Sequence, residues 1–118
     1  MSRSDFGRVF DASEELQITV KGRKSGRDHS TPVWFVREEN TIFLLPVRGS
    51  KNQWYKNAQH SKKIKITSGK LSYDLTPRFL TDSKMVASVA DKFRKKHGAA
   101  DVKKYYAVYD VALQLTIP

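Results

Sequence analysis

The segment Leu16–Arg37, LQITVKGRKSGRDHSTPVWFVR, decides the fold of this chain. Its first half places Leu16, Ile18 and Val20 alternately with polar residues, which is the period-two pattern of a half-buried strand. Residues 31–36 are rich in β-branched and aromatic side chains, as strands are. A short polar loop joins the two runs, so the segment predicts a β-hairpin.

The loop of this hairpin, residues 22–27, reads GRKSGR. Its two glycines allow positive φ, so that backbone amides can converge on an anion. Arg23, Lys24 and Arg27 add positive charge, and Ser25 adds a hydroxyl donor. The loop therefore predicts a phosphate or carboxylate site. An ordinary polar hairpin turn explains the same residues equally well.

The composition bounds the class of protein. The chain has 118 residues, enough for one domain over residues 1–118, and a net charge of +10. This charge favours an anionic partner: nucleic acid, an anionic membrane surface or a multiply charged small ligand. The absence of cysteine excludes disulfides, thiolate metal sites and cysteine catalysis. No signal peptide or transmembrane run is visible, so we expect a cytoplasmic protein.

Metal binding is not expected either, because the three histidines are far apart in the sequence and no carboxylate stands at ligand spacing from them.

The rest of the chain alternates strand and helix signals. Residues 1–12 suggest a short helix or arm with an apolar edge of Phe6, Val9 and Phe10. The remaining predicted strands are 41–47, 63–67, 71–80 with an interruption at Pro77, and 108–117. One predicted helix is 51–59, capped by Ser50, and the other is 82–97, capped by Thr81 or Asp82 and ended by Gly98.

Residues 42–45 are apolar without alternation. A strand of this kind is buried on both faces, or is covered on one face by a partner or a ligand. In total the pattern predicts six strands, joined mostly by hairpins. Such strands bury one face each and leave few exposed edges when they close into a compact antiparallel barrel with helices over its open side. The predicted class is therefore α+β.

The positive charge is organised around a second small basic loop, residues 48–51, which also follows a strand. Together with Trp34, Trp54 and Tyr55, the two basic loops could hold a flat aromatic ligand that bears a phosphate. Each aromatic residue taken alone is more typical of a core position.

Two motifs resemble the deazaflavin-dependent nitroreductase family. The first is TVKGRKSGR at residues 19–27 with TPVWFVR at residues 31–37, and the second is RGS at residues 48–50 with WYKN at residues 54–57. This similarity spans roughly residues 16–80. That family belongs to the split β-barrel flavin-reductase superfamily, which also contains pyridoxamine 5'-phosphate oxidase-like proteins.

The resemblance implies a six-stranded split barrel of the FMN-binding type, a homodimer with cofactors at the subunit interface, and coenzyme F-420, with FMN as the alternative. The basic loop would hold the phosphate or its acidic tail, residues 47–50 would line the ring and phosphate, and Trp54 and Asn57 would support them. The predicted coenzyme-binding residues are Arg23, Lys24, Ser25, Arg27, Pro32, Trp34, Val47, Arg48, Gly49, Ser50, Trp54 and Asn57.

The acceptor side is predicted from a tyrosine-rich segment between the last helix and the last strand. Tyr105 and Tyr109 share a face if the segment is helical, and are assigned as catalytic residues that cover the ring and donate a hydroxyl to the substrate. Tyrosines that simply pack the end of the barrel explain the segment equally well.

The chain departs from the family at Asp28 and His29, where members often have Pro-Arg, so activity on nitro compounds does not follow from the resemblance. The predicted function is an F-420-dependent oxidoreductase that passes a hydride to an electron-poor or conjugated acceptor. The alternatives are an FMN-binding oxidoreductase, a flavin carrier of the same fold, and a basic module that binds single-stranded nucleic acid.

Overall fold

The computed structural model describes residues 10–11 and 13–118. The expected arm with Phe6 and Val9 therefore lies outside the described residues, whereas Phe10 is fully buried. The strands are β1 (Glu15–Lys21), β2 (Asp28–Glu38), β3 (Thr41–Leu44), β4 (Ile64–Ser68), β5 (Leu71–Leu75), β6 (Arg78–Leu80) and β7 (Ala112–Thr116). The helices are the 3-10 turn η1 (Gly49–Lys51), α2 (Gln53–Ser61), α3 (Ser83–His97) and α4 (Ala99–Tyr105).

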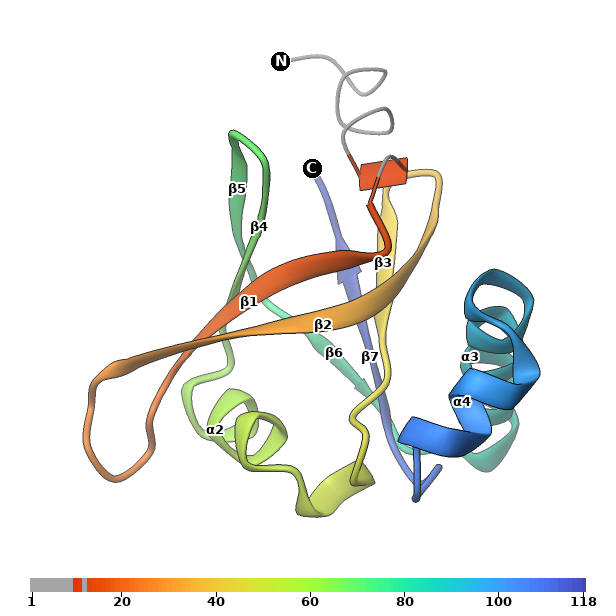
Figure 1. Cartoon of the computed structure of the whole chain (residues 1–118). Coiled ribbons are helices and arrows are strands. Elements are labelled where there is room, and N and C mark those ends of the chain that lie inside the picture. Colours follow the sequence, from red (N-terminus) through yellow and green to blue (C-terminus); the bar gives the residue numbers. More distant parts are fainter. Residues whose placement is uncertain (1–9, 12) are drawn as a thin grey trace.

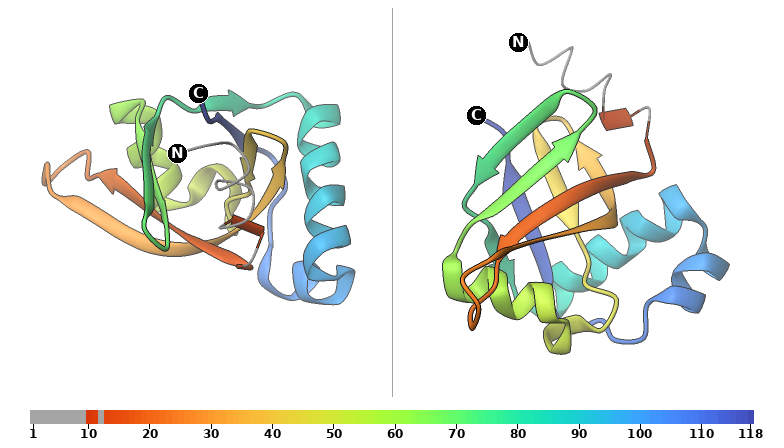
Figure 2. Two further views of the ribbon diagram at one scale, coloured as in Figure 1. Left: turned by 90° about the horizontal axis from the view of Figure 1, so that it is seen from above. Right: turned by 60° about the vertical axis from the view of Figure 1, so that its left-hand side comes forward.

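The strands form one antiparallel sheet in the order β5-β4-β1-β2-β3-β7-β6. Its two edge strands, β5 and β6, are joined by only Thr76 and Pro77, so the sheet curls back on itself (Figures 1 and 2). The α+β class and the antiparallel pairing are confirmed, and the predicted barrel takes the form of a half-barrel, a curled sheet whose edge strands β5 and β6 are not paired. The predicted count of six strands becomes seven, because the predicted strand 71–80 breaks at Pro77, which has no amide hydrogen for the ladder.

The inside of the curl holds the main hydrophobic core. Inward-facing residues alternate along β1, β3, β4 and β7, as the period-two pattern predicts. Helix α2 closes one end of the barrel and buries Tyr55 and Ala58 in this core. Phe10 also enters it and meets the ring of Phe35 edge-on at 5.8 Å.

A second apolar layer lies between the outside of the sheet and the helices α3 and α4. Strand β3 has its two faces in different layers: Ile42 and Leu44 point into the barrel, and Phe43 packs against the helical layer. The prediction that this strand has two covered faces is therefore confirmed. Its second face is covered by helices of the same chain, so it gives no evidence for a partner.

Several predicted boundaries were wrong for local reasons. Strand β3 ends at Leu44 instead of continuing to residue 47, because Pro46 cannot extend the ladder. Ser50 does not cap a helix; it lies within η1, and Asn52 occupies the N-cap of α2. Helix α4 was not predicted, and β7 spans residues 112–116 rather than 108–117. Of the two predicted caps of α3, Thr81 and Asp82, the structure has Asp82, whose side chain accepts from the amide of Met85.

Strand β2 is eleven residues long and has a free edge. β1 pairs with residues 28–34 of β2, whereas β3 pairs only with residues 35–38. The edge of residues 28–34 that faces away from β1 therefore has no pairing with β3. Pro32 fits this arrangement. The Gly22 amide donates to the Arg27 carbonyl, so these two residues form a hydrogen-bonded pair of the β1–β2 ladder. Such pairs alternate with non-hydrogen-bonded pairs, and Pro32, opposite Gln17, falls in a non-hydrogen-bonded pair. Its nitrogen therefore points away from β1, where no amide hydrogen is needed.

Candidate functional site

The basic loop is anchored to helix α2 by Arg23. The guanidinium donates through Nη1 to Asn57 Oδ1 at 2.7 Å and through Nη2 to Gln53 Oε1 at 2.8 Å, and the Arg23 amide donates to the same Asn57 oxygen at 3.2 Å. Asn57 is itself buried. Both acceptors are neutral, so the contacts fix the position of Arg23 and leave its charge uncompensated.

The loop keeps its positive charge but uses most of its amides internally. The amides of Gly22, Gly26 and Arg27 donate to acceptors within the loop, and that of Arg23 donates to Asn57. Among the described residues, none forms an ion pair with Arg23, Lys24 or Arg27. The loop is thus a cluster of three cations, of which Arg23 is held in place, with two unpartnered amides, those of Lys24 and Ser25, rather than a full ring of amide donors.

Five predicted coenzyme-binding residues meet in a hollow between the loop and α2. This loop hollow has a volume of about 400 Å³ and is lined by Gly22, Arg23, Lys24, Ser25, His29, Gln53, Trp54 and Asn57. Trp54 and Asn57, which the resemblance assigned to the support of residues 47–50, thus line a hollow with the first basic loop. The hollow brings together cations, amide groups and one indole.

Four other predicted residues meet in a second hollow. This tyrosine hollow has a volume of about 360 Å³ and is lined by Glu15, Pro32, Trp34, Val47, Tyr105 and Tyr106. The Trp34 ring lies between two partners, stacked on His97 at 4.4 Å and edge-on to Tyr105 at 5.5 Å. Apart from Glu15, its walls are aromatic or apolar, which suits a flat ring.

His97 holds the tryptophan from behind. It is buried, and its Nε2 lies 3.1 Å from the carbonyl oxygen of Phe35. A carbonyl only accepts, so Nε2 carries a hydrogen, and Nδ1 is left without a partner among the described residues. Burial lowers the pKa of His97 below its ordinary value, and the neighbouring Lys96 acts in the same direction.

Residues 48–50 have partners of their own. The Ser50 amide and hydroxyl both donate to Asp110, the Gly49 amide donates to the Pro46 carbonyl, and the Arg48 amide donates to Asn52. These amides were predicted to bind a phosphate. In this chain the carboxylate of Asp110 accepts the hydrogen bonds of Ser50 that were predicted for a phosphate.

Besides residues 48–50, two predicted residues lie outside both hollows. Arg27 is at the exposed tip of the hairpin, and Tyr109 lies beside Arg94, with its hydroxyl 3.4 Å from the Val102 carbonyl. Because α4 ends at Tyr105, the segment that follows is not helical, and the condition under which Tyr105 and Tyr109 would share a face is not met. Tyr106, rather than Tyr109, joins Tyr105 in the tyrosine hollow.

The loop hollow and the tyrosine hollow lie at opposite ends of the free edge of β2. His29 lines the first, and Pro32 and Trp34 line the second. Figure 1 shows α2 beneath the hairpin half of β2, and α4 lower and further to the right. Residues 28–34 of an extended strand span roughly 20 Å. His29 shares a face of β2 with Val33, which packs on the main core, whereas Trp34 packs on the helical layer. An elongated ligand with a ring at one end and a phosphate at the other would match this spacing if it crossed the edge of β2.

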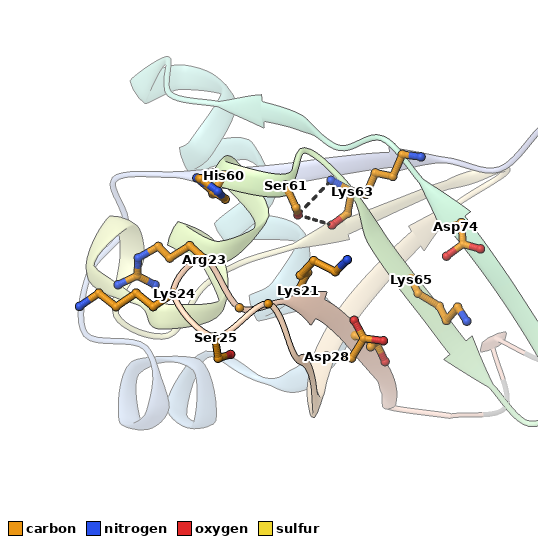
Figure 3. A pocket seen from close by; sticks show the side chains of 13 residues that line it. Lys21, Arg23, Lys24, Ser25, Asp28, His60, Ser61, Lys63, Lys65 and Asp74 are labelled. Carbon is orange, nitrogen blue, oxygen red and sulfur yellow. Dashed lines mark hydrogen bonds between the residues drawn. The ribbon is translucent and has the colours of Figure 1, made fainter.

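A third and larger hollow, of about 740 Å³, opens on the other side of the basic loop (Figure 3). Its lining includes Lys21, Lys63 and Lys65 from β1 and the start of β4, together with Asp28 and Asp74. We refer to it as the lysine hollow. It shares residues 22–25 with the loop hollow, so the basic loop forms a wall between the two.

Two other features are absent from the described part of the chain. No group of three or more His, Cys, Asp or Glu side chains there could hold a metal ion. None of the described helices has the length and apolar character needed to cross a membrane.

Comparison with protein families gives one match, over residues 8–116, to the model of a family described as an uncharacterized protein conserved in bacteria, DUF2255. The chain belongs to DUF2255. The match spans nearly the whole chain and includes both hollows along β2. The narrower resemblance to deazaflavin-dependent nitroreductases stays a prediction for this DUF2255 chain.

Solved structures share the fold of this DUF2255 chain at low sequence identity. An F-420-H2-dependent reductase is 17% identical with a TM-score of 0.65, covering 86% of this chain and 93% of that one. A putative pyridoxamine 5'-phosphate oxidase from Listeria innocua is 8% identical with a TM-score of 0.73, covering 97% and 91%. A protein described as a domain-swapped dimer is 16% identical with a TM-score of 0.68, covering 96% and 95%. At these identities the comparison shows a split-barrel-like fold and no specific activity.

The sequence did not single out every residue that lines these hollows. Gln53 was missed because a polar residue at a helix start carries no signal of its long-range partner Arg23. Glu15 was not assigned because it precedes the predicted strand 16–21. Tyr106 was placed beside Tyr105 and Tyr109 in the tyrosine-rich segment but was not assigned as catalytic. Lys63 and Lys65 were read as part of the general positive charge. The register Thr19↔Lys65 and the contact with the basic loop became visible only in the sheet.

Proposed function

We propose that this protein is a deazaflavin-dependent oxidoreductase that uses reduced coenzyme F-420 to reduce an electron-poor or conjugated acceptor. The ring of the coenzyme would lie in the tyrosine hollow, and its phosphate would lie in the loop hollow. The observation that carries this proposal is the position of the two hollows at the two ends of one free strand edge. FMN has the same order of ring and phosphate and is the alternative coenzyme.

The residues present fit such a molecule at both ends. Trp34, Pro32 and Val47 give the tyrosine hollow an apolar surface, and its volume lies within the range of about 300–1,000 Å³ for small-molecule sites. At the other end, Arg23 and Lys24 keep uncompensated charges that a phosphate would neutralise.

Each part of the chain has a role that can be stated from its contacts. Gln53 and Asn57 hold Arg23 in place, so its charge is pre-positioned before a ligand binds. His97 and Tyr105 fix the plane of Trp34. Tyr105 is half exposed at the mouth of the hollow, where its hydroxyl is available to an acceptor. When bound, the reduced coenzyme supplies the hydride, and the protein orients it and excludes water.

A second copy of the chain would complete the site. Val47 and Tyr105, which line the tyrosine hollow, are respectively 37% and 53% exposed, so a single chain leaves the ring position open to solvent. A homodimer whose partner covers this opening would shield the ring. The likeness to a domain-swapped dimer supports this arrangement.

The test is a fluorescence titration of the purified chain with F-420 and, separately, with FMN. Arg23→Gln combined with Lys24→Gln should weaken coenzyme binding by about 2–4 kcal/mol, at about 1–2 kcal/mol for each charge-assisted contact. Lys70→Gln combined with Lys84→Gln is the matched control, because it removes the same charge from exposed positions outside the three hollows. Equal dissociation constants for the two double variants would refute the phosphate site. Tighter binding of FMN than of F-420 would decide for the alternative coenzyme.

A further inference from the structure

The lysine hollow concentrates cations from separate segments of the chain. Lys21 ends β1, Lys63 precedes β4, Lys65 lies within β4, and Arg23 and Lys24 come from the basic loop. Figure 3 shows Lys21 in the middle of the view, with Arg23 and Lys24 to one side of it and Lys65 to the other. Two carboxylates, Asp28 and Asp74, line the same hollow, so its lining carries a net charge of +3.

These charges are not neutralised within the chain, although carboxylates are close in the sheet. Asp74 is the cross-strand partner of Lys65, and Asp28 is the cross-strand partner of Lys21. Even so, no ion pair joins any of these four side chains to another described residue. Opposite charges at facing positions usually favour pairing. Here the cations and the carboxylates are both left available to a ligand.

The lining also sets the chemical character of the ligand. Its remaining members are glycine, serine, threonine and one histidine, so the hollow offers no apolar or aromatic wall beyond the His60 ring. A ligand that fits must therefore be polar throughout. Anionic groups would bind the cations, and hydroxyl groups would donate to Asp28 and Asp74. A continuous nucleic acid backbone is disfavoured, because its phosphates would meet these two carboxylates.

We propose that the lysine hollow binds a small polyol carrying two phosphate groups. Its phosphates contact Lys21, Lys65 and the neighbouring cations, and its hydroxyl groups donate to Asp28 and Asp74. The volume of about 740 Å³ is sufficient for a molecule of this size. The site does not depend on the oxidoreductase proposal, because Lys63, Lys65 and Asp74 line this hollow and neither of the other two.

Isothermal titration of the full chain at 150 mM salt tests the site, with fructose 1,6-bisphosphate and inorganic pyrophosphate as probes. Lys21→Gln combined with Lys65→Gln should weaken binding of both probes at least about 10-fold, as expected for the loss of two charge-assisted contacts. Lys70→Gln combined with Lys84→Gln should change it less than about 2-fold, since screening at this salt removes most long-range effects of exposed charges. No binding by the parent, or equal weakening by the two double variants, would overturn the site.

Variants of the two carboxylates distinguish binding of a sugar bisphosphate from binding of an anion without hydroxyl groups. Asp28→Asn combined with Asp74→Asn removes negative charge, so pyrophosphate should bind more tightly. Fructose 1,6-bisphosphate should gain less, because its hydroxyl groups lose charged acceptors. An equal gain for both probes would overturn the recognition of hydroxyl groups. If a single-stranded oligonucleotide binds more tightly than either probe, and depends on Lys21 and Lys65 more strongly, the ligand is a nucleic acid strand and the proposal is wrong.

Discussion

Ser50 and Asp110 are joined by two hydrogen bonds across 60 residues of sequence. The Ser50 amide donates to Oδ1 at 2.9 Å and the Ser50 hydroxyl donates to Oδ2 at 2.5 Å. The Ala107 amide adds a bond of 2.9 Å to the Val47 carbonyl. Together these contacts tie the segment after α4 to the turn before α2. Val47 lies in the turn before α2, and Tyr105 is the last residue of α4. Both line the tyrosine hollow, so these hydrogen bonds help to set its shape.

Replacing Asp110 by Ala should loosen this connection. We expect a loss of about 1–2 kcal/mol in the free energy of unfolding, at the low end because Asp110 is exposed. The Ser50 hydroxyl holds the pKa of Asp110 below its ordinary value, so the contribution is complete above the unfolded pKa near 4 and is lost as the pH falls through the folded value. Urea unfolding at pH 7 and pH 3 measures both effects. If the difference in unfolding free energy between parent and variant is the same at the two pH values, the ionised form of Asp110 does not contribute to stability.

Gly49 is required by the same contact. It has φ of +57°, and a β-carbon there would lie 2.0 Å from Asp110 Oδ1. Gly49→Ala should cost at least about 2 kcal/mol, which combines backbone strain of about 1–2 kcal/mol with displacement of Asp110. Gly26→Ala is the matched control: Gly26 has φ of +71° and open space around it, so only the strain should appear. Equal melting temperatures for the two variants would contradict the role assigned to the contact.

Tyr105 and Tyr109 are distinguished by their surroundings. If the oxidoreductase proposal is correct, Tyr105→Phe should lower the single-turnover rate of hydride transfer about 5–10-fold, the value of one hydrogen bond made to the acceptor. Coenzyme affinity and thermal stability should not change. Tyr109→Phe removes a hydroxyl that faces the Val102 carbonyl outside the hollow, and it should turn over like the parent. A slow Tyr109→Phe variant beside a normal Tyr105→Phe variant would move the acceptor site to the other tyrosine.

The proposed homodimer can be tested by light scattering of the purified chain with and without coenzyme. We expect the mass of two chains at micromolar concentration, because one chain leaves the tyrosine hollow open at Tyr105 and Val47. Val47→Asp should shift the mass toward one chain and weaken coenzyme binding together, since a buried unpaired charge disfavours the interface. A chain that binds coenzyme while it has the mass of one copy would exclude the shared site.

His97 should make stability depend on pH between neutral and mildly acidic conditions. Burial lowers its folded pKa below the unfolded value near 6.5, so the unfolded state takes up a proton first as the pH falls. Stability should therefore decrease from about pH 6.5 downward and level off below the folded pKa. Lys96, which donates to the same Phe35 carbonyl at 2.9 Å, and Glu14 are the charged groups that act on His97.

His97→Phe checks this assignment, because it keeps a ring against Trp34 and cannot be protonated. Melting temperatures at pH 7.5 and pH 5 should differ less for this variant than for the parent. An identical pH dependence in both proteins would assign the effect to other groups.

The sequence by itself determined the strands, because a half-buried strand records its inward face in every second residue. Leu16, Ile18 and Val20 predicted β1, and the apolar periodicity between a cap at Thr81 or Asp82 and the stop at Gly98 predicted α3. Local rules failed where a residue had two possible partners. Ser50 has the side chain of a helix cap, yet it donates to Asp110, and no local pattern encodes a partner 60 residues away.

Only the tertiary structure decided which candidate residues meet. The motif residues that suggested one site are divided between two hollows along β2, and this division follows from the length of β2 beyond the reach of β3. The lysines of the third hollow come from different strands, so the sheet register places them side by side and their sequence spacing does not. Charge and periodicity are properties of a local sequence, whereas a binding site depends on how distant segments are paired.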